Sequence, residues 1–204
     1  MTAIILAGGK ASRMGGRDKA FLKIGDETLI GIQLRGLKNI FKEIIIVTNS
    51  PDRYIGLKGV KVVSDIVPYQ GPLGGIFSGL TASNDNHNFI VACDMPFLNG
   101  PLIKYMTENR NGFDIIVPKI GKRFHPLFGI YSKDCIPAIE EMLKKNRLKV
   151  TNIFPKVRTR FILKDEITKF DGKLLSLVNI NTKKDLTRAK EIPQHNFNIK
   201  RHVF

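Results

Sequence analysis

A glycine-rich, basic loop follows the first apolar run of the sequence and could hold phosphate. The loop covers residues 6–19 and contains four glycines and four basic residues. Glycine lets backbone N–H groups approach an anion closely, Arg13 could form two parallel hydrogen bonds to phosphate oxygens, and Lys19 could add a point charge. The spacing matches neither the P-loop nor the G-x-G-x-x-G dinucleotide fingerprint. These residue types favour a phosphate site, with a solvated glycine-rich turn as the alternative.

Two carboxylates stand at the ends of apolar runs. Asp94 comes just after the run Phe89–Ala92, and the chain then breaks at Pro96. Magnesium commonly binds one or two carboxylates together with phosphate oxygens and water, and it assists transfer at phosphorus. Asp94 is therefore the candidate Mg²⁺ ligand, and an aspartate bonded to backbone amides is the alternative. Asp65 ends the run Lys61–Ser64 and, taken alone, fits a residue that caps a turn.

The elements that must position these residues alternate between two patterns. Short apolar runs predict strands at Ala3–Ala7, Glu43–Thr48, Lys61–Ser64, Phe89–Ala92 and Asp114–Pro118. Helical patterns lie at Leu29–Leu37, Leu73–Ala82, Pro101–Glu108, Lys133–Lys145 and Lys183–Glu191, the last with Thr182 as N-cap and Asp185 three residues later. This rhythm predicts a Rossmann-like, three-layer α/β/α fold with a mainly parallel, mixed sheet. Ligands of such sheets bind at the carboxyl ends of the strands, where the loop and both aspartates would meet.

Length and composition predict one cytoplasmic domain. We expect the domain to cover residues 1–192, with 193–204 as a basic C-terminal extension. Neither a signal peptide nor a run of ~20 apolar residues occurs, and the two cysteines lack C-x-x-C spacing, so neither a membrane span, a disulfide framework nor a zinc site is expected. The net charge of +15 would attract a polyanion, either nucleic acid or a polyphosphate substrate, or it is a solvated basic surface.

The loop sequence L-A-G-G-K-A-S-R-M-G-G-R-D-K resembles the signature of the nucleotidyltransferases that build molybdenum cofactor dinucleotides, most closely the molybdenum cofactor guanylyltransferases. Ala11 stands where many members have serine, and residues 15–17 make the loop one residue longer than the shortest form of the motif. Further segments match in order as far as Leu186: K-V-V-S-D, G-P-L-G-G, C-D-M-P, R-F-H-P-L and N-I-N-T.

The resemblance implies a nucleotide-diphospho-sugar transferase type of fold and a magnesium-dependent reaction. GMP would pass from GTP to molybdopterin or molybdenum cofactor, with release of pyrophosphate. The catalytic residues implied are Arg13, Lys19 and the metal ligand Asp94. The nucleotide-binding residues implied are Leu6, Ala7, Gly8, Gly9, Gly15, Lys19, Asp65, Gly71, Gly75 and Asp94. The acceptor-binding residues implied are Arg123, His125, Asn179 and Asn181.

Three other functions compete with this interpretation. A cytidylyltransferase, or a transferase for another phosphorylated acceptor, shares the first loop and the C-D-x-P segment. A nucleic-acid-binding protein would explain the basic charge, but Asp65 and Asp94 would repel a phosphate backbone, and no alternation of aromatic and basic residues occurs. A nucleotide-binding regulator would not need Arg13, Lys19 and Asp94 together. We therefore expect GTP and molybdopterin as partners, without nucleic acid or membrane, and transient contact with proteins that deliver or accept the cofactor.

Overall fold

The computed structural model describes residues 1–8 and 18–192. Within them, the main sheet has the strand order β10-β7-β9-β6-β1-β4-β5, with β8 paired to β7. The strands are β1 (Thr2–Leu6), β4 (Glu43–Thr48), β5 (Lys61–Ser64), β6 (His87–Ala92), β7 (Ile115–Ile120), β8 (Arg123–Phe124), β9 (Phe128–Ser132) and β10 (Thr159–Leu163). β1 runs parallel to β4 and β6, whereas β9 is antiparallel to β6 and β7. The sheet is thus mixed and mainly parallel, as predicted.

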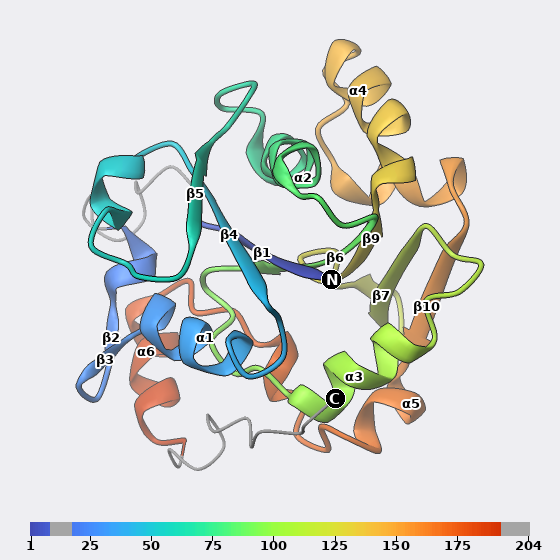
Figure 1. Cartoon of the computed structure of the whole chain (residues 1–204). Coiled ribbons are helices and arrows are strands. Elements are labelled where there is room, and N and C mark those ends of the chain that lie inside the picture. The colour runs from blue at the N-terminus through green and yellow to red at the C-terminus, as the bar shows by residue number, and fades with distance from the viewer. Residues whose placement is uncertain (9–17, 193–204) are drawn as a thin grey trace.

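Helices cover both faces of this sheet. They are α1 (Leu29–Leu37), α2 (Gly71–Ala82), α3 (Gly100–Glu108), α4 (Ile136–Lys144), α5 (Lys164–Thr168) and α6 (Lys183–Lys190). In Figure 1, α2 and α4 lie above the sheet, and α1 and α3 lie below it. None of the helices in the described residues has the length and apolar character needed to cross a bilayer.

Alternate residues of the central strands pack into two separate hydrophobic cores, one on each face of the sheet. In β1, Ala3 and Ile5 pack with α1 and α3, whereas Ile4 and Leu6 pack with α2 and α4. All four side chains are buried, which explains the continuous apolar run in the sequence. The three-layer α/β/α prediction is therefore confirmed.

Shorter elements complete the chain around the sheet. A two-stranded hairpin joins β2 (Lys23–Ile24) to β3 (Glu27–Thr28). The 3₁₀ helices are η2 (Lys19–Phe21), η3 (Pro51–Tyr54), η4 (Lys133–Cys135), η5 (Val150–Lys156) and η6 (Leu175–Leu177). The helix expected at Lys133–Lys145 is divided between η4 and α4, and Pro137 lies in the first turn of α4.

The segment Arg123–Tyr131, whose R-F-H-P-L motif resembles a strand of the family, does not form one continuous strand. The structure forms the two-residue strand β8, a turn through His125 and Pro126, and then β9. Proline cannot donate to a sheet ladder, and the amide of Phe128 instead bonds the carbonyl of His125 at 3.3 Å. β8 and β9 are both antiparallel to β7, so the chain reverses before β8, at Gly121, and the turn through His125 and Pro126 only interrupts the returning strand.

Gly79 lets α2 approach the sheet closely. A Cβ at this position would lie 2.5 Å from Ile4 Cγ2 and 3.2 Å from Val47 Cγ2. We expect Gly79→Ala to lower the free energy of unfolding by about 1–3 kcal/mol because the buried layer cannot absorb the added carbon. Denaturant unfolding would measure this change. Gly56→Ala is the matched control, since no heavy atom lies within 4 Å of a Cβ there, and equal stability losses in both variants would contradict the account.

Candidate active site

A cavity of about 310 Å³ opens where three parallel strands end. Leu6 at the end of β1 is in register with Val47 of β4 and with Ala92 of β6, so the residues that follow these strands converge there. The lining residues are Leu6, Ala7, Gly8, Asp18, Lys19, Thr48, Asn49, Ser50, Arg53, Pro72, Ala92, Cys93, Asp94, Leu127 and Asn179. This volume is in the range of small-molecule sites, and the strand ends are where such sheets bind ligands.

Asp94 lies at the centre of a polar network in this cavity. Asn179 donates from Nδ2 to Asp94 Oδ1 at 2.9 Å, and the Lys19 ammonium lies 3.4 Å from Asp94 Oδ2. Lys19 also donates to Asn181 Oδ1 at 2.6 Å. The side chains of Lys19 and Asp94 are 25% and 15% exposed, so the pair is partly shielded yet open to a ligand. The structure thus brings together four residues that the sequence marked separately.

The two asparagines reach this network because Ile180 between them is anchored. Its side chain is buried in a small cluster with Phe97 and Ala189, and its amide bonds the carbonyl of Asp94 at 2.8 Å. Alternate residues of an extended segment point to opposite sides, which directs both asparagines away from that cluster. The segment then enters α6 through the predicted capping box of Thr182 and Asp185, which is present.

Lys19 is held in place by Asp18 and Tyr54. Asp18 caps η2 by accepting from the Ala20 amide at 3.1 Å, and its other oxygen accepts from the Tyr54 hydroxyl at 2.9 Å. Burial, and then the nearby Asp18 carboxylate, raise the pKa of Tyr54 well above its usual range. The phenol therefore remains a donor at neutral pH, and the turn that carries Lys19 is fixed at both carboxylate oxygens of Asp18.

Asp65 lies next to Gly8 at the border of the cavity, although it is not among the lining residues. A Cβ on Gly8 would come 3.4 Å from Asp65 Oδ2 and 3.3 Å from Asn49 Nδ2, so these three residues are close neighbours. Burial raises the pKa of Asp65, while the Asn49 and Ser78 side chains partly oppose this rise. Asp65 Oδ1 is buried without a hydrogen-bond partner among the described residues. Such an unsatisfied buried acceptor calls for a donor, which a ligand could supply.

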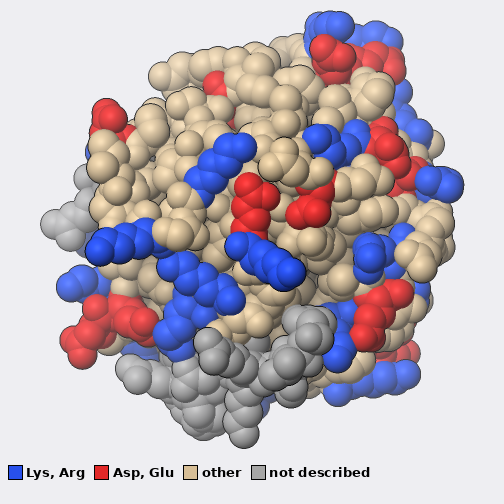
Figure 2. Space-filling view, viewed as in Figure 1, with Lys and Arg blue, Asp and Glu red and all other residues tan. Residues whose placement is uncertain are grey.

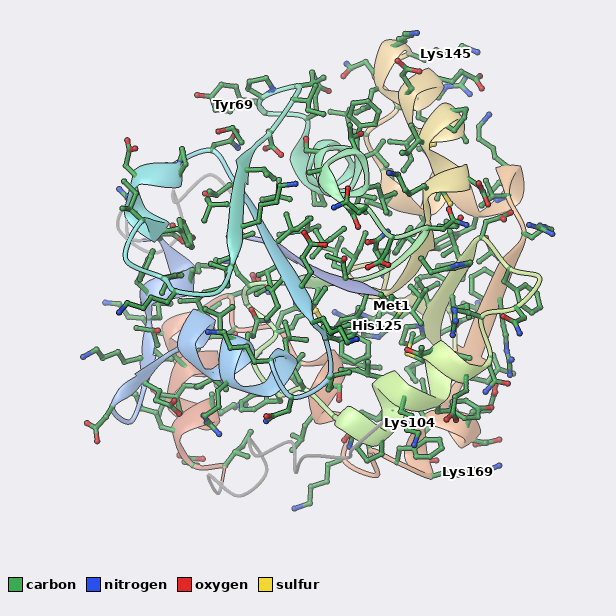
Figure 3. All side chains as sticks on the ribbon, viewed as in Figure 1. Met1, Tyr69, Lys104, His125, Lys145 and Lys169 are labelled. Carbon is green, nitrogen blue, oxygen red and sulfur yellow. The ribbon has the colours of Figure 1, made fainter. Side chains whose placement is uncertain are left out.

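The two glycines proposed at the start of α2 differ in their surroundings. Gly75 packs tightly, since a Cβ there would lie 3.2 Å from Leu6 Cδ2 and 3.7 Å from Asp65 Oδ1. Gly71 has φ +62° and open space around it. Tyr69, two residues before Gly71, also has a positive φ and projects outward, as Figure 3 shows. Gly75 thus serves helix-to-sheet packing beside the cavity, and Gly71 provides the backbone turn into α2.

Arg123 and His125 do not line the cavity. Arg123 lies in β8 and His125 in the turn that follows it, and His125, labelled in Figure 3, is half-buried. Burial, followed by the neighbouring Arg123 charge, lowers the pKa of His125 to about 4. The imidazole is therefore neutral at pH 7. Leu127, two residues later, does reach the lining, so the turn borders the site.

The protein side chains around Asp94 could bind a metal ion only if a substrate supplied further ligands. No group of three or more His, Cys, Asp or Glu side chains that could bind a cation occurs in residues 1–8 and 18–192. Magnesium retains water and uses phosphate oxygens, so one protein carboxylate facing a nucleotide cavity fits it. Gly9, Arg13 and Gly15 lie outside the described residues, and their roles stay predictions.

Sequence reasoning missed Asn49, Ser50 and Arg53 in the cavity lining. They follow the strand Glu43–Thr48, which was predicted with the correct bounds. Their position after a buried parallel strand was the available signal, because the carboxyl ends of such strands form the ligand crevice.

Comparison with known proteins places this fold and site in one class. Residues 3–156 match the family described as MobA-like NTP transferase domain, which defines the class as nucleotidyltransferase. A probable molybdenum cofactor guanylyltransferase of Pelotomaculum thermopropionicum is 37% identical over 194 residues, which cover 95% of this chain and 94% of the relative. A probable molybdenum cofactor guanylyltransferase of Clostridium perfringens is 38% identical over 205 residues, which cover 94% of this chain and 98% of the relative. The chain therefore belongs to the molybdenum cofactor guanylyltransferase family, as its motifs predicted.

A solved structure shares the fold over nearly the whole chain. The molybdopterin-guanine dinucleotide biosynthesis protein A of Archaeoglobus fulgidus superposes with a TM-score of 0.79 and 23% identity. The match covers 94% of this chain and 97% of that chain. This similarity supports the nucleotide-diphospho-sugar transferase type of fold.

Proposed function

We propose that this chain transfers GMP from GTP to molybdopterin or molybdenum cofactor and releases pyrophosphate. The observation that carries the proposal is the network in which Asp94 contacts Lys19 and Asn179 at the strand ends. A cation and a carboxylate side by side in a cavity suit a substrate that is both anionic and metal-bound. The guanylyl group and the acceptor are inferred from the relatives, which are described as probable molybdenum cofactor guanylyltransferases.

Asp94 would bind Mg²⁺, which is the cofactor we propose. When bound, the ion would offset the charge of the triphosphate and of the developing leaving group. The Asn179 amide occupies Asp94 Oδ1, and Oδ2 faces Lys19. Asn179 would therefore fix the carboxylate orientation, which favours a positioning role for it in addition to the predicted contact with the acceptor.

Lys19 would stabilise negative charge as the α-phosphate is attacked. The attacking acceptor phosphate needs no strong general base because the second pKa of a phosphate monoester is about 6. Positioning of the two substrates and neutralisation of their charge can then supply most of the rate enhancement. Asn181 accepts from Lys19 and would hold its ammonium toward the reacting phosphate. Arg13 and the amides of Gly8, Gly9 and Gly15 are proposed to hold the remaining phosphate oxygens.

The turn with Arg123 and His125 would bind the acceptor. His125 is neutral at pH 7, so it would offer hydrogen bonds, while Arg123 would offer charge. The net charge of +15 would attract two anionic substrates. On the face in Figure 2, Lys and Arg side chains are interspersed with Asp and Glu, so this face lacks the single-sign surface typical of a nucleic-acid site. Contact with cofactor-delivering or cofactor-accepting proteins, and a cytoplasmic location, stay predictions.

Asp65 is proposed to select guanine. The buried Asp65 Oδ1, which has no hydrogen-bond partner among the described residues, could accept from the N–H groups on one edge of guanine. Cytosine has a different arrangement of donors and acceptors on its edge. Wild-type protein should therefore bind GTP more tightly than ITP, which lacks the exocyclic amine, and more tightly than CTP. Asp65→Asn should reduce the GTP preference by about tenfold or more, because it replaces an acceptor with a donor. Titration calorimetry with Mg²⁺ would test this, and an unchanged preference in the variant would remove Asp65 from base selection.

A further inference from the structure

A second cavity adjoins the first on the other side of Asp18. Its volume is about 650 Å³, and it is formed by the turn after Asp18, by η3 and by α6. Asp18 and Arg53 line both cavities, so the two are neighbours that share these side chains. Phe21, Leu22 and Leu186 give it partly buried apolar walls. No motif of the sequence and no residue of the proposed mechanism accounts for this cavity.

Three cations from three different elements line it: Lys23 of β2, Arg53 of η3 and Lys190 of α6. Within the described part of the chain, none of their side chains forms an ion pair or hydrogen bond, in contrast to the paired Lys145 and Arg158. Folding has therefore brought three positive charges to one cavity without an ion pair to any of them within the described residues.

Asp18 is the one carboxylate in the described lining, so three cations face a single negative charge. Its Oδ1 accepts from the Ala20 amide and its Oδ2 from the Tyr54 hydroxyl, so both oxygens are already directed into the protein. Like charges that converge in a concave site raise the local positive potential and attract a multivalent anion. An unpaired cation set of this kind is suited to an anion with several charges more than to a single carboxylate.

We propose that the second cavity binds the pyrophosphate group of the reaction. This inference rests on the proposed transfer, in which an oxygen of the acceptor phosphate forms a bond to the α-phosphorus. The bond from the α-phosphorus to the bridging oxygen breaks, and its electron pair leaves with pyrophosphate. Arg53 borders the reaction cavity and the second cavity, so it can contact the pyrophosphate group in both. Lys23 and Lys190 lie only in the second cavity and would stabilise the group after the bond is broken.

Binding of inorganic pyrophosphate, measured by calorimetry without nucleotide or acceptor, tests this site. The double variant Lys23→Gln and Lys190→Gln should weaken pyrophosphate binding by about tenfold or more, and it should bind inorganic phosphate with little change. The matched control is Lys183→Gln with Lys184→Gln, which removes the same charge from exposed positions of α6 outside the cavity. The control should stay within about twofold of wild type because its two lysines do not line the cavity, and salt screens charges at a distance.

The same variants identify the source of the pyrophosphate group. Weaker binding of GTP but not of GMP would assign the site to the bound triphosphate, whereas weaker product inhibition by pyrophosphate alone would assign it to the released product. Either result supports the site. Equal pyrophosphate affinity in the wild type and both double variants, or equal losses in the two double variants, would overturn it. Because pyrophosphate binding is measured without acceptor, the proposed site can fail while GMP transfer holds, or hold while the acceptor proves different.

Discussion

Asp94→Asn is expected to fold like the wild-type protein and to lose about 10²-fold or more of its Mg²⁺-dependent kcat. The amide keeps the shape of the side chain, and its single oxygen can still accept from either Asn179 or Lys19, but it lacks the negative charge that a cation needs. Circular dichroism and thermal unfolding would compare the folds, and pyrophosphate release at several Mg²⁺ concentrations would compare turnover.

Asp26→Asn provides the control for this change. Asp26 is exposed in the β2–β3 hairpin, outside both cavities, so its loss should leave turnover unchanged. If Asp94→Asn retained wild-type rates and the wild-type dependence on Mg²⁺, Asp94 would have no role as metal ligand. A variant that failed to unfold cooperatively would be replaced by Asp94→Ser, which also removes the charge.

Lys19→Met should lower kcat/KM by about 10²-fold or more while shifting the melting temperature little. The methionine preserves most of the length of the side chain but removes the ammonium that contacts Asp94 and Asn181. The lysine is partly exposed, and ion pairs of that kind contribute little to stability. The expected effect is thus on the reaction rather than on the fold.

Steady-state kinetics and thermal unfolding would be measured in parallel for Lys19→Met and for Lys42→Met. Lys42 is exposed and lies outside both cavities, so its variant reports the general effect of losing one positive charge. Similar kcat/KM values in the two variants would contradict the role of Lys19. A large loss of melting temperature in Lys19→Met alone would assign it a structural role instead.

The sequence predicted the central layers well because their signals are local. β4, β5 and α1 have the predicted bounds, since continuous apolar runs mark the strands and Thr28 caps the helix with its side chain. β10 was missed because it is a partly exposed edge strand that begins with Thr159 and Arg160, so its apolar run is only three residues long. The turn through Pro126 was not predicted because the R-F-H-P-L segment resembles a strand of the family.

The site could be predicted only in part because its contacts are distant in sequence. The resemblance marked Lys19, Asp94, Asn179 and Asn181, and the structure brings their side chains into contact across 75, 85 and 162 positions. The packing of Tyr54 against Asp18 depends on the position of η3, which no local pattern specified. The same holds for the second cavity, whose cations come from three separate elements.

Competition among the four nucleoside triphosphates most directly tests the proposed guanylyl transfer. The protein would be incubated with Mg²⁺, a molybdopterin acceptor and equal concentrations of GTP, CTP, ATP and UTP, and the dinucleotide products would be quantified by mass spectrometry. The guanine dinucleotide should form with one pyrophosphate per product and exceed each of the others by about 10²-fold or more, because a pocket that hydrogen-bonds the distinguishing groups rejects other bases. A predominant cytosine dinucleotide, or no dinucleotide from folded protein, would contradict the proposed function.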